Sequence, residues 1–338
     1  MKIAVIGATS HGMTLAAYLK TIYDDVTLVD LEIAPLEAIQ LHGINVVGAT
    51  TFQVNNIAVK TAEQLESDYD LIFIFSPSRS NSLLFPMIES KIKATCMIVS
   101  FQENLSDWRT IRTFTKQPVF SAVCHFQATL KNTHTVSITT DLEYFSRHAF
   151  DLCDYKQMHP FNAAEIKNIL DAVGHTMLTS LPTNIKWSKT LFSSAIDRLS
   201  SALNCSYGDI LHHSTALLTA IHIADEIVRI AKKRNIILST TGGANFNDLI
   251  INSDTKLEEL VPVFQMLILP HQYTRTNILK SELFEYDIID DLVTEALKVD
   301  QPTPYLDLLS YCLHFLRDRP FHENIQLFEP LILGNTLK

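Results

Sequence analysis

Short apolar runs alternate with helical periodicity through the first part of the chain. Residues 2–6 and 70–75 are almost wholly apolar, which is typical of strands in the middle of a parallel sheet that is covered on both faces. Residues 13–19 repeat apolar positions at helical spacing, and residues 26–29 form a second short apolar run. This order predicts a strand, a helix and a second parallel strand at the N-terminus.

The same alternation continues to about residue 180. Further strands are expected at 51–60, 96–101, 119–124 and 175–179, and short helices at 61–67, 82–92 and 107–115. Strands that alternate with helices predict an α/β fold with a Rossmann-type doubly wound parallel sheet. Two strand-like runs, 125–130 and 133–139, are joined by only two residues and predict a hairpin. Residues 31–49 show a mixed pattern.

The second part of the chain has helical periodicity in nearly every segment. The expected helices are 185–203, 215–233, 257–269, 281–297 and 305–316. We expect a turn at 240–243 and an irregular tail after Pro320. The change of pattern predicts a dinucleotide-binding Rossmann domain over residues 1–181 and an all-helical substrate and dimerisation domain over residues 182–338.

The loop after the first strand resembles a phosphate-binding turn, and it reads Gly7-Ala8-Thr9-Ser10-His11-Gly12. It keeps the first and third glycines of G-x-G-x-x-G and has a threonine in place of the second. The N–H groups at the start of the following helix would face a pyrophosphate. Asp30 ends the second strand, where an acidic side chain can bind a ribose hydroxyl. The alternative is a loop that only makes a turn.

Other cofactor contacts are expected where neighbouring strands end. Ligands of open parallel sheets bind outside the carboxyl ends of the strands. Ser76 follows the strand at 70–75, and Gln102 and Glu103 follow the strand at 96–101, so these side chains are expected to line the cofactor cleft. Ala128, in the predicted hairpin, is assigned to the same group.

Composition narrows the function classes. A chain of 338 residues with 47% hydrophobic and 19% charged residues can bury a large core in two domains. A net charge of −10 argues against nucleic acid and against an anionic membrane surface as partners, and no apolar run approaches the length of a membrane span. Five scattered cysteines indicate reduced core residues of a cytoplasmic protein.

Metal and nucleophile motifs are absent from the sequence. His212, His213 and His222 lack partners at metal-ligand spacing, and neither HExxH nor CxxC occurs, so no bound metal is expected. Gly-x-Ser-x-Gly is also absent, which argues against a hydrolase with a nucleophile elbow.

The first helix of the second domain carries a polar face. Lys189, Ser193 and Asp197 are four residues apart and therefore share one side of the helix. One interpretation is a solvated face with i,i+4 pairs. The other is a lysine at the rim of a cleft, where partial desolvation would suit its ammonium group to donate a proton.

The whole chain resembles the ketopantoate reductase family. The segment Trp187-Ser188-Lys189-Thr190-Leu191-Phe192-Ser193 corresponds to the family's W-x-K-L-x-x-N pattern at the start of its second domain. The stretch Glu285-Tyr286-Asp287-Ile288-Ile289-Asp290-Asp291 corresponds to E-I-D-x-I-N-G, and Pro302-Thr303-Pro304-Tyr305 follows at the family's spacing.

The resemblance implies a Rossmann domain, a helical domain and an active site between them. Lys189 would then donate a proton to the nascent alkoxide, and Glu285 would position the substrate or the lysine. Ser193, Asp197 and Thr276 would bind substrate. The implied cofactor is NAD or NADP, and Asp30 followed by Leu31 favours NADH, because the basic residue that often meets the 2′-phosphate is missing.

The chain departs from the family pattern near the chemistry. Glu103 stands where Q-N-G has asparagine, and Ser193 and Asp197 replace two asparagines after the lysine. We expect an NAD(P)H-dependent reductase of a small 2-oxo acid or related keto compound, with a homodimer as a further expectation. The alternative is a non-catalytic nucleotide-binding or sensor protein that kept the fold and lost turnover.

Overall fold

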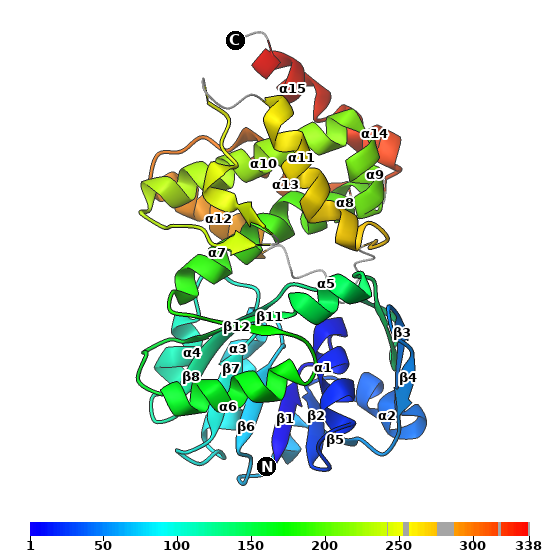
Figure 1. Ribbon diagram of the computed structural model, residues 1–338, viewed down its shortest axis with the longest axis vertical. Helices are drawn as coiled ribbons and strands as arrows, with labels where there is room; N and C mark the ends of the chain where they lie inside the picture. The colour runs from blue at the N-terminus through cyan, green and yellow to red at the C-terminus, as the bar shows by residue number, and fades with distance from the viewer. Residues whose placement is uncertain (242, 253–256, 276–286, 317–318, 337–338) are drawn as a thin grey trace. The chain divides into compact units, whose positions relative to one another are not determined.

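The computed structural model describes residues 1–241, 243–252, 257–275, 287–316 and 319–336. It divides into two compact units, Met1–Pro182 and Thr183–Lys338 (Figure 1).

The N-terminal unit is built on an eight-stranded sheet in the order β12-β11-β8-β7-β6-β1-β2-β5. Its strands are β1 (Ile3–Ile6), β2 (Val26–Asp30), β5 (Ala58–Thr61), β6 (Leu71–Ile74), β7 (Met97–Ser100), β8 (Val119–Cys124), β11 (Phe150–Asp154) and β12 (Thr176–Thr179). Six neighbouring strands of this sheet, in the order β8-β7-β6-β1-β2-β5, pair in parallel. This is the Rossmann strand order, and it confirms the predicted fold class. β11 pairs antiparallel with β8, so the last two strands run the other way.

The strand order reverses between β1 and β6. The chain builds outward from β1 to β2 and β5, and then returns to place β6 on the other side of β1. Gly7 follows β1 and Ser76 lies two residues after β6, so both lie at this switch point. Open α/β sheets bind ligands at such a position.

A second sheet has four strands in the order β4-β3-β10-β9. They are β3 (Ile44–Gly48), β4 (Phe52–Val54), β9 (Ala128–Asn132) and β10 (Thr135–Ile138). β9 and β10 form the predicted hairpin. The expected strand over residues 51–60 is wrong, because Asn56 adopts a left-handed conformation with φ 59° and divides it into β4 and β5, which belong to different sheets. The mixed segment before it contains α2 (Ile33–His42) and β3.

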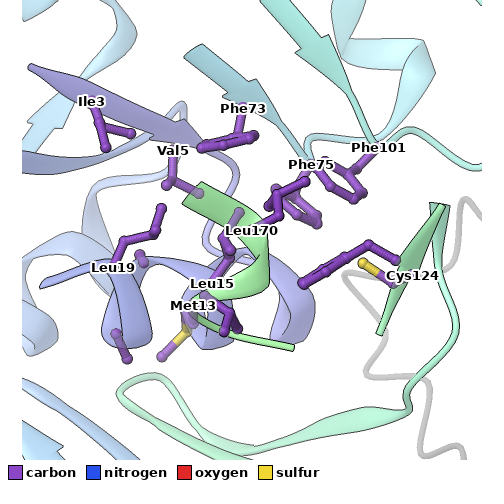
Figure 2. Packing of buried hydrophobic residues seen from close by; sticks show 14 of the residues in the cluster. Ile3, Val5, Met13, Leu15, Leu19, Phe73, Phe75, Phe101, Cys124 and Leu170 are labelled. Atoms are coloured by element: carbon purple, nitrogen blue, oxygen red, sulfur yellow. The ribbon is translucent and has the colours of Figure 1, made fainter. Parts of the chain in front are cut away.

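Helix α1 (Ser10–Lys20) contacts strands of both sheets. Its buried residues include Met13, Leu15 and Leu19, and they belong to the same hydrophobic cluster as Val5. Figure 2 shows Leu19 of α1 close to Val5 of β1. A helix that is apolar on most sides is a buried helix. The loop that begins α1 is therefore anchored to a helix with little room to move.

The remaining helices of this unit are short. They are α3 (Asn81–Glu89), α4 (Trp108–Thr113), α5 (Leu142–Arg147) and α6 (Pro160–Asp171), with 3₁₀ turns η1 (Ala62–Gln64) and η2 (Ser78–Ser80). Leu84 and Phe85 of α3 pack in a second cluster with Ile72 and Ile74 of β6. Phe75 and Phe101, just after β6 and β7, stack with ring centroids 4.5 Å apart (Figure 2).

The C-terminal unit is helical. Its helices are α7 (Pro182–Phe192), α8 (Leu199–Leu203), α9 (Tyr207–His212), α10 (Ser214–Lys233), α11 (Leu257–Ile268), α12 (Asp287–Lys298), α13 (Pro304–Phe315), α14 (Phe321–Gln326) and α15 (Glu329–Thr336). The smaller elements are the π-helical segment η3 (Ser193–Arg198), the turns η4 (Phe246–Asp248) and η5 (Leu269–His271), and a hairpin of β13 (Thr240–Thr241) and β14 (Ala244–Asn245). Helix α10 is the centre, because it contacts α9, η3, α11, α12, α13 and α15.

Two details differ from the sequence prediction. The tail after Pro320 is helical rather than irregular: Asn324 is fully buried, and its side chain donates to the carbonyl oxygens of Ala202 at 2.7 Å and Leu316 at 2.9 Å. The single helix predicted over 185–203 is interrupted by a π-helical segment at Ser193–Arg198. In the described part of the chain, no helix has the length and apolar character needed to cross a membrane.

Candidate functional site

The two glycines of the first loop are required by close backbone contacts. Gly7 has φ +108°, and a Cβ placed on it would lie 2.6 Å from the backbone nitrogen of Ser76. A Cβ on Gly12 would lie 2.2 Å from the carbonyl oxygen of Gly7. Both positions therefore exclude a side chain, as the first and third positions of a dinucleotide-binding loop do.

Thr9 replaces the middle glycine without strain. Its backbone is extended, with φ −73° and ψ 168°, and it is the N-cap of α1. Its hydroxyl oxygen accepts a hydrogen bond from the N–H of Gly12 at 3.1 Å. Such a cap stabilises a helix by about 1 kcal/mol. The threonine thus has a local structural role that the glycine pattern did not reveal.

Asp30 lies against the same loop. Its Oδ2 accepts a hydrogen bond from the N–H of Ala8 at 2.5 Å, and its Oδ1 accepts one from the N–H of Glu32 at 2.9 Å. The carboxylate is only partly buried. Because each carboxylate oxygen can accept more than one hydrogen bond, Asp30 keeps acceptor capacity for a ribose hydroxyl.

His11 connects the loop to the segment before β9. Its Nε2 lies 3.0 Å from the carbonyl oxygen of Phe126, and the two rings are 5.1 Å apart. Since a carbonyl oxygen can only accept, Nε2 carries the proton in this bond. Ala128, two residues later, is 8% exposed and belongs to the hydrophobic cluster under α1.

Gln102 holds the ends of two neighbouring strands together. Its side-chain nitrogen donates to the carbonyl oxygen of Ser76 and to Oδ1 of Asn81, both at 2.7 Å, and its oxygen accepts from Nδ2 of Asn81 at 3.0 Å. Gln102 and Asn81 are both buried, whereas Glu103 is exposed. Gln102 therefore braces the edge of the sheet, and Glu103 is the neighbour that reaches solvent.

A buried carboxylate holds the other end of this loop. Asp107 accepts hydrogen bonds from Ser100 Oγ at 2.6 Å and from Ser121 Oγ at 2.5 Å. The two serines are paired across β7 and β8. The loop over residues 102–107 is thus fixed at both ends, which the sequence prediction missed because the serines and the aspartate share no motif.

Two polar atoms near these strand ends lack partners. Ser76 Oγ and Asn104 Oδ1 are buried and have no hydrogen-bond partner among the residues that the structure describes. Leaving such an atom unsatisfied costs about 1–3 kcal/mol. They are therefore candidates to bind a ligand at the switch point, and together with the glycine loop they fit a dinucleotide. Ser76 is among the residues expected from the sequence to line the cofactor cleft, and Asn104 is not.

Lys189 lies on α7 in the C-terminal unit. Its side chain is 8% exposed, and its ammonium nitrogen is 5.8 Å from the centroid of the Phe192 ring. Lys186, one turn earlier, is also buried. A partly desolvated ammonium group beside an aromatic ring can interact with the face of that ring.

Ser193 begins the π-helical segment η3 and is almost fully buried. A π segment inside an α-helix is rare and occurs frequently at functional sites. It changes the relative direction of the residues on either side, so the simple fourfold spacing of Lys189, Ser193 and Asp197 does not describe this face. Residues 185–203 contain neither proline nor glycine, so the sequence did not indicate the π-helical segment.

Asp197 is paired on both oxygens. Its Oδ2 lies 2.6 Å from an N–H nitrogen of Arg198, and its Oδ1 accepts a hydrogen bond from the hydroxyl of Tyr207 at 2.9 Å. Neither Arg198 nor Tyr207 was among the site residues expected from the sequence. Ser206 and Asp209 form a capping box, so the sequence could indicate that α9 starts near Tyr207. A capping box does not indicate where the side chain of Tyr207 points.

Two expected residues, Thr276 and Glu285, lie outside the described residues. Arg275, next to Thr276, is described, and its guanidinium donates to the backbone oxygen of Asn204 at 3.0 Å and to its side-chain oxygen at 3.1 Å. The roles of Thr276 and Glu285 stay predictions.

A buried carboxylate elsewhere in this unit has a structural role. Glu226 on α10 accepts hydrogen bonds from the N–H groups of Tyr305 and Leu306, both at 2.9 Å, at the start of α13. Burial raises the pKa of Glu226 to about 8, although the two hydrogen bonds act in the opposite direction. His222 stacks on the Tyr305 ring at 4.5 Å. This group holds α10 to α13.

No metal site or reactive thiol emerges from the described part of the chain. Those residues contain no group of three or more histidine, cysteine or acidic side chains that could hold a metal ion. All five cysteines are free and buried, and burial raises the pKa of Cys153 to about 12. A thiol with so high a pKa is a poor nucleophile at neutral pH.

Comparison with known proteins gives consistent results. The family model described as ketopantoate reductase PanE/ApbA matches residues 3–145, and its C-terminal counterpart matches residues 183–317. A 2-dehydropantoate 2-reductase from Pyrococcus horikoshii is 24% identical over 237 residues, which cover 70% of this chain and 75% of that protein.

Solved structures share the fold. D-mandelate dehydrogenase in complex with NADH and anilino(oxo)acetate matches with a TM-score of 0.77 at 18% identity, over 94% of this chain and 99% of the other. A PanE/ApbA family ketopantoate reductase from Ralstonia eutropha matches with a TM-score of 0.73 at 15% identity, over the same shares of the two chains. Since the matched family regions extend through both units, the chain belongs to the ketopantoate reductase family and is an NAD(P)-dependent oxidoreductase.

Proposed function

We propose that this protein reduces the carbonyl group of a small 2-oxo acid or related keto compound. The observation that carries the proposal is the burial of Lys189. This lysine lies on α7 in the segment that resembles the family's lysine pattern, and Ser193, at the end of that segment, is also buried. A desolvated ammonium group is a suitable proton donor to a developing alkoxide.

The residues of each unit have separate tasks in this proposal. When bound, a reduced nicotinamide cofactor would supply the hydride. The start of α1 would hold its pyrophosphate and Asp30 a ribose hydroxyl. Ser76 Oγ and Asn104 Oδ1, which have no hydrogen-bond partner among the described residues, would bind its polar groups near the strand ends. Lys189 would protonate the substrate oxygen, Ser193 would orient the substrate, and Thr276 and Glu285 would complete the substrate contacts.

NADH is the proposed cofactor. Two backbone N–H groups fix the carboxylate of Asp30 beside the loop, and the next residue is Leu31 rather than a basic one. A fixed negative charge repels the 2′-phosphate of NADPH and accepts hydrogen bonds from the free hydroxyl of NADH.

A non-catalytic nucleotide sensor is the second candidate. The observation that favours it is the exposure of Glu103. This residue follows Gln102 directly and stands where the family pattern has asparagine. An additional negative charge there would oppose an anionic substrate. In this case the protein would bind the dinucleotide and show no turnover.

Assembly and location form part of the proposal. On α13, Tyr311 and Phe315 lie one turn apart with rings 5.3 Å from each other, and they are 51% and 72% exposed. Exposed aromatic pairs are frequent in protein interfaces, so we propose a homodimer. The five free, buried cysteines support a reducing, cytoplasmic environment. Sedimentation velocity measures the oligomeric state.

One experiment separates the two candidate functions. The purified protein is titrated with NADH and NADPH by fluorescence, and a panel of 2-oxo acids is then tested for oxidation of the cofactor that binds. Binding with turnover of at least one acid supports the reductase. Binding without turnover of any acid supports the sensor, and failure to bind either cofactor contradicts both.

A further inference from the structure

The π-helical segment that follows α7 carries a negative residue, Asp197, whose charge is compensated by Arg198. Both oxygens of Asp197 accept hydrogen bonds, one from Arg198 at 2.6 Å and one from the Tyr207 hydroxyl at 2.9 Å. The side chain of Asp197 is 15% exposed and that of Arg198 is 1% exposed. So little solvent reaches the pair that its charges are weakly screened.

Because Asp197 is mostly buried and Arg198 is buried, the compensation of the Asp197 charge by Arg198 would affect the binding of an anionic substrate. A carboxylate next to a bound anionic substrate would repel it strongly in a partly desolvated site. With the guanidinium of Arg198 in contact, the pair has no net charge and its field at a distance is that of a dipole. Arg198 would therefore determine whether an anion can approach Asp197.

Tyr207 links the pair to the lysine. Its side chain is fully buried, and its ring meets the edge of the Phe192 ring with centroids 6.5 Å apart. The centroid of the Phe192 ring in turn lies 5.8 Å from the Lys189 ammonium nitrogen and 5.6 Å from the centroid of the His271 ring. The hydroxyl of Tyr207 thus fixes Asp197 while its ring supports the aromatic group beside Lys189.

We infer that Asp197, Arg198 and Tyr207 are positioning residues that determine substrate specificity by cancelling the charge of Asp197. A keto acid with a free carboxylate can approach these three residues, because no uncompensated negative charge on them repels it. An amine-bearing keto compound meets no uncompensated negative charge at Asp197, since Arg198 already pairs with this carboxylate. The inference rests on the proposed function.

The test compares a 2-oxo acid that the wild type reduces with the methyl ester of the same acid. In Arg198→Gln the aspartate loses its counter-charge, so the ratio of kcat/KM for acid to that for ester is expected to fall by roughly 10- to 100-fold. In the double variant Asp197→Asn/Arg198→Gln the charge is gone, and the ratio is expected to return to within about threefold of wild type.

A purely structural role predicts a different result. Loss of packing would lower kcat/KM for acid and ester by the same factor and leave their ratio unchanged. The matched control is Arg229→Gln on α10, which breaks an Asp–Arg pair of 2.9 Å with Asp225 in the same unit. This control is expected to lower the midpoint of urea unfolding without altering the ratio.

Tyr207→Phe carries the test if Arg198→Gln does not fold. It removes one hydrogen bond to Asp197 and keeps the ring that packs on Phe192, so the protein is expected to fold. The acid-to-ester ratio is expected to fall by roughly 3- to 10-fold, because one carboxylate oxygen is released.

The outcomes distinguish this inference from the proposed function. If the wild type reduces acids but the ratio is unchanged in Arg198→Gln, or in Tyr207→Phe where that variant replaces it, the inference is overturned and the function stands. If the wild type reduces the ester but not the acid, or prefers an amine-bearing compound, the inference is also overturned. If the wild type reduces no keto compound with either cofactor, the proposed function fails and the inference falls with it.

Discussion

The carboxylate of Asp30 accepts a hydrogen bond from the backbone N–H of Ala8 at 2.5 Å. This bond ties the end of β2 to the loop after β1, and it fixes a negative charge beside the proposed ribose site. The charge and the anchoring can be separated by substitution.

Asp30→Asn is expected to shift the cofactor preference toward NADPH. The amide oxygen keeps one acceptor for the N–H of Ala8, while the charge that repels a 2′-phosphate is removed. We expect the ratio of the NADPH to NADH dissociation constants to fall about tenfold, or roughly 1.4 kcal/mol. Fluorescence titration measures both constants. Asp25→Asn is the control, since Asp25 is exposed at the opposite end of the same strand. A wild-type protein that binds NADPH about tenfold more tightly than NADH would contradict the assignment of Asp30.

Gly7→Ala is expected to destabilise the N-terminal unit and to abolish dinucleotide binding. The new methyl group would lie 2.6 Å from the backbone nitrogen of Ser76, at a residue with φ +108°. The strain costs on the order of 1–3 kcal/mol in the free energy of unfolding, which urea denaturation measures.

The matched control for that substitution is Gly334→Ala on α15, where the added Cβ would point into open space. In a helix interior, alanine is favoured over glycine by about 1 kcal/mol, so this variant should be equal to or more stable than the wild type. Equal stability of both alanine variants would show that the Gly7 loop relaxes without strain.

Lys189→Ala is expected to abolish turnover and leave cofactor binding intact. Loss of a positioned proton donor lowers the rate by about 10²–10⁴, and the dinucleotide loop belongs to the other unit. Steady-state kinetics with a 2-oxo acid, together with fluorescence titration of NADH, measures the two effects. Lys232→Ala, at an exposed position of α10, controls for the loss of a lysine. Retention of wild-type kcat in Lys189→Ala would remove Lys189 from the mechanism.

Glu226 is expected to make stability depend on pH. Burial raises the pKa of this carboxyl to about 8 in the folded protein from its ordinary value of 4.5, so the folded state holds a proton that the unfolded chain releases between these values. The contribution to the free energy of unfolding is therefore complete below about pH 4.5 and is lost as the pH rises toward 8.

The measurement is urea unfolding of wild type and Glu226→Gln at several values between pH 5 and pH 8. The variant cannot titrate at this position, so the stability of the wild type relative to the variant should decline across the range. Glu323→Gln, at an exposed position of α14, should instead run parallel to the wild type. A difference between wild type and Glu226→Gln that is constant with pH would show that the carboxyl keeps an ordinary pKa.

The Asp197–Arg198 ion pair bears on ketopantoate as a substrate. A lone carboxylate in this segment would make ketopantoate a poor substrate by repulsion. Because Arg198 lies 2.6 Å from that carboxylate, repulsion gives no reason to exclude ketopantoate. Asp197 and Arg198 are adjacent in the sequence, but adjacent residues on a helix point in different directions. The long arginine side chain allows its guanidinium group to reach the carboxylate of Asp197.

Local patterns were sufficient for the N-terminal strands and the glycine loop. The run at residues 70–75 could only be a buried strand, and Gly7 and Gly12 follow from one short motif. The second sheet was not predictable in the same way. Its strand β3 pairs with β10, about 90 residues later, and no local pattern encodes such a pairing. Asn324 is a similar case, because the tail becomes helical through bonds to Ala202 and Leu316.

The burial of α1 between two sheets has a dynamic consequence. Most of its residues are buried, so its amide hydrogens should exchange with deuterium only through opening of the whole N-terminal unit. The loop from Gly7 to Gly12 shares that rigid support. Its shape would then be present before any ligand arrives, and binding would cost little conformational entropy in this part of the chain.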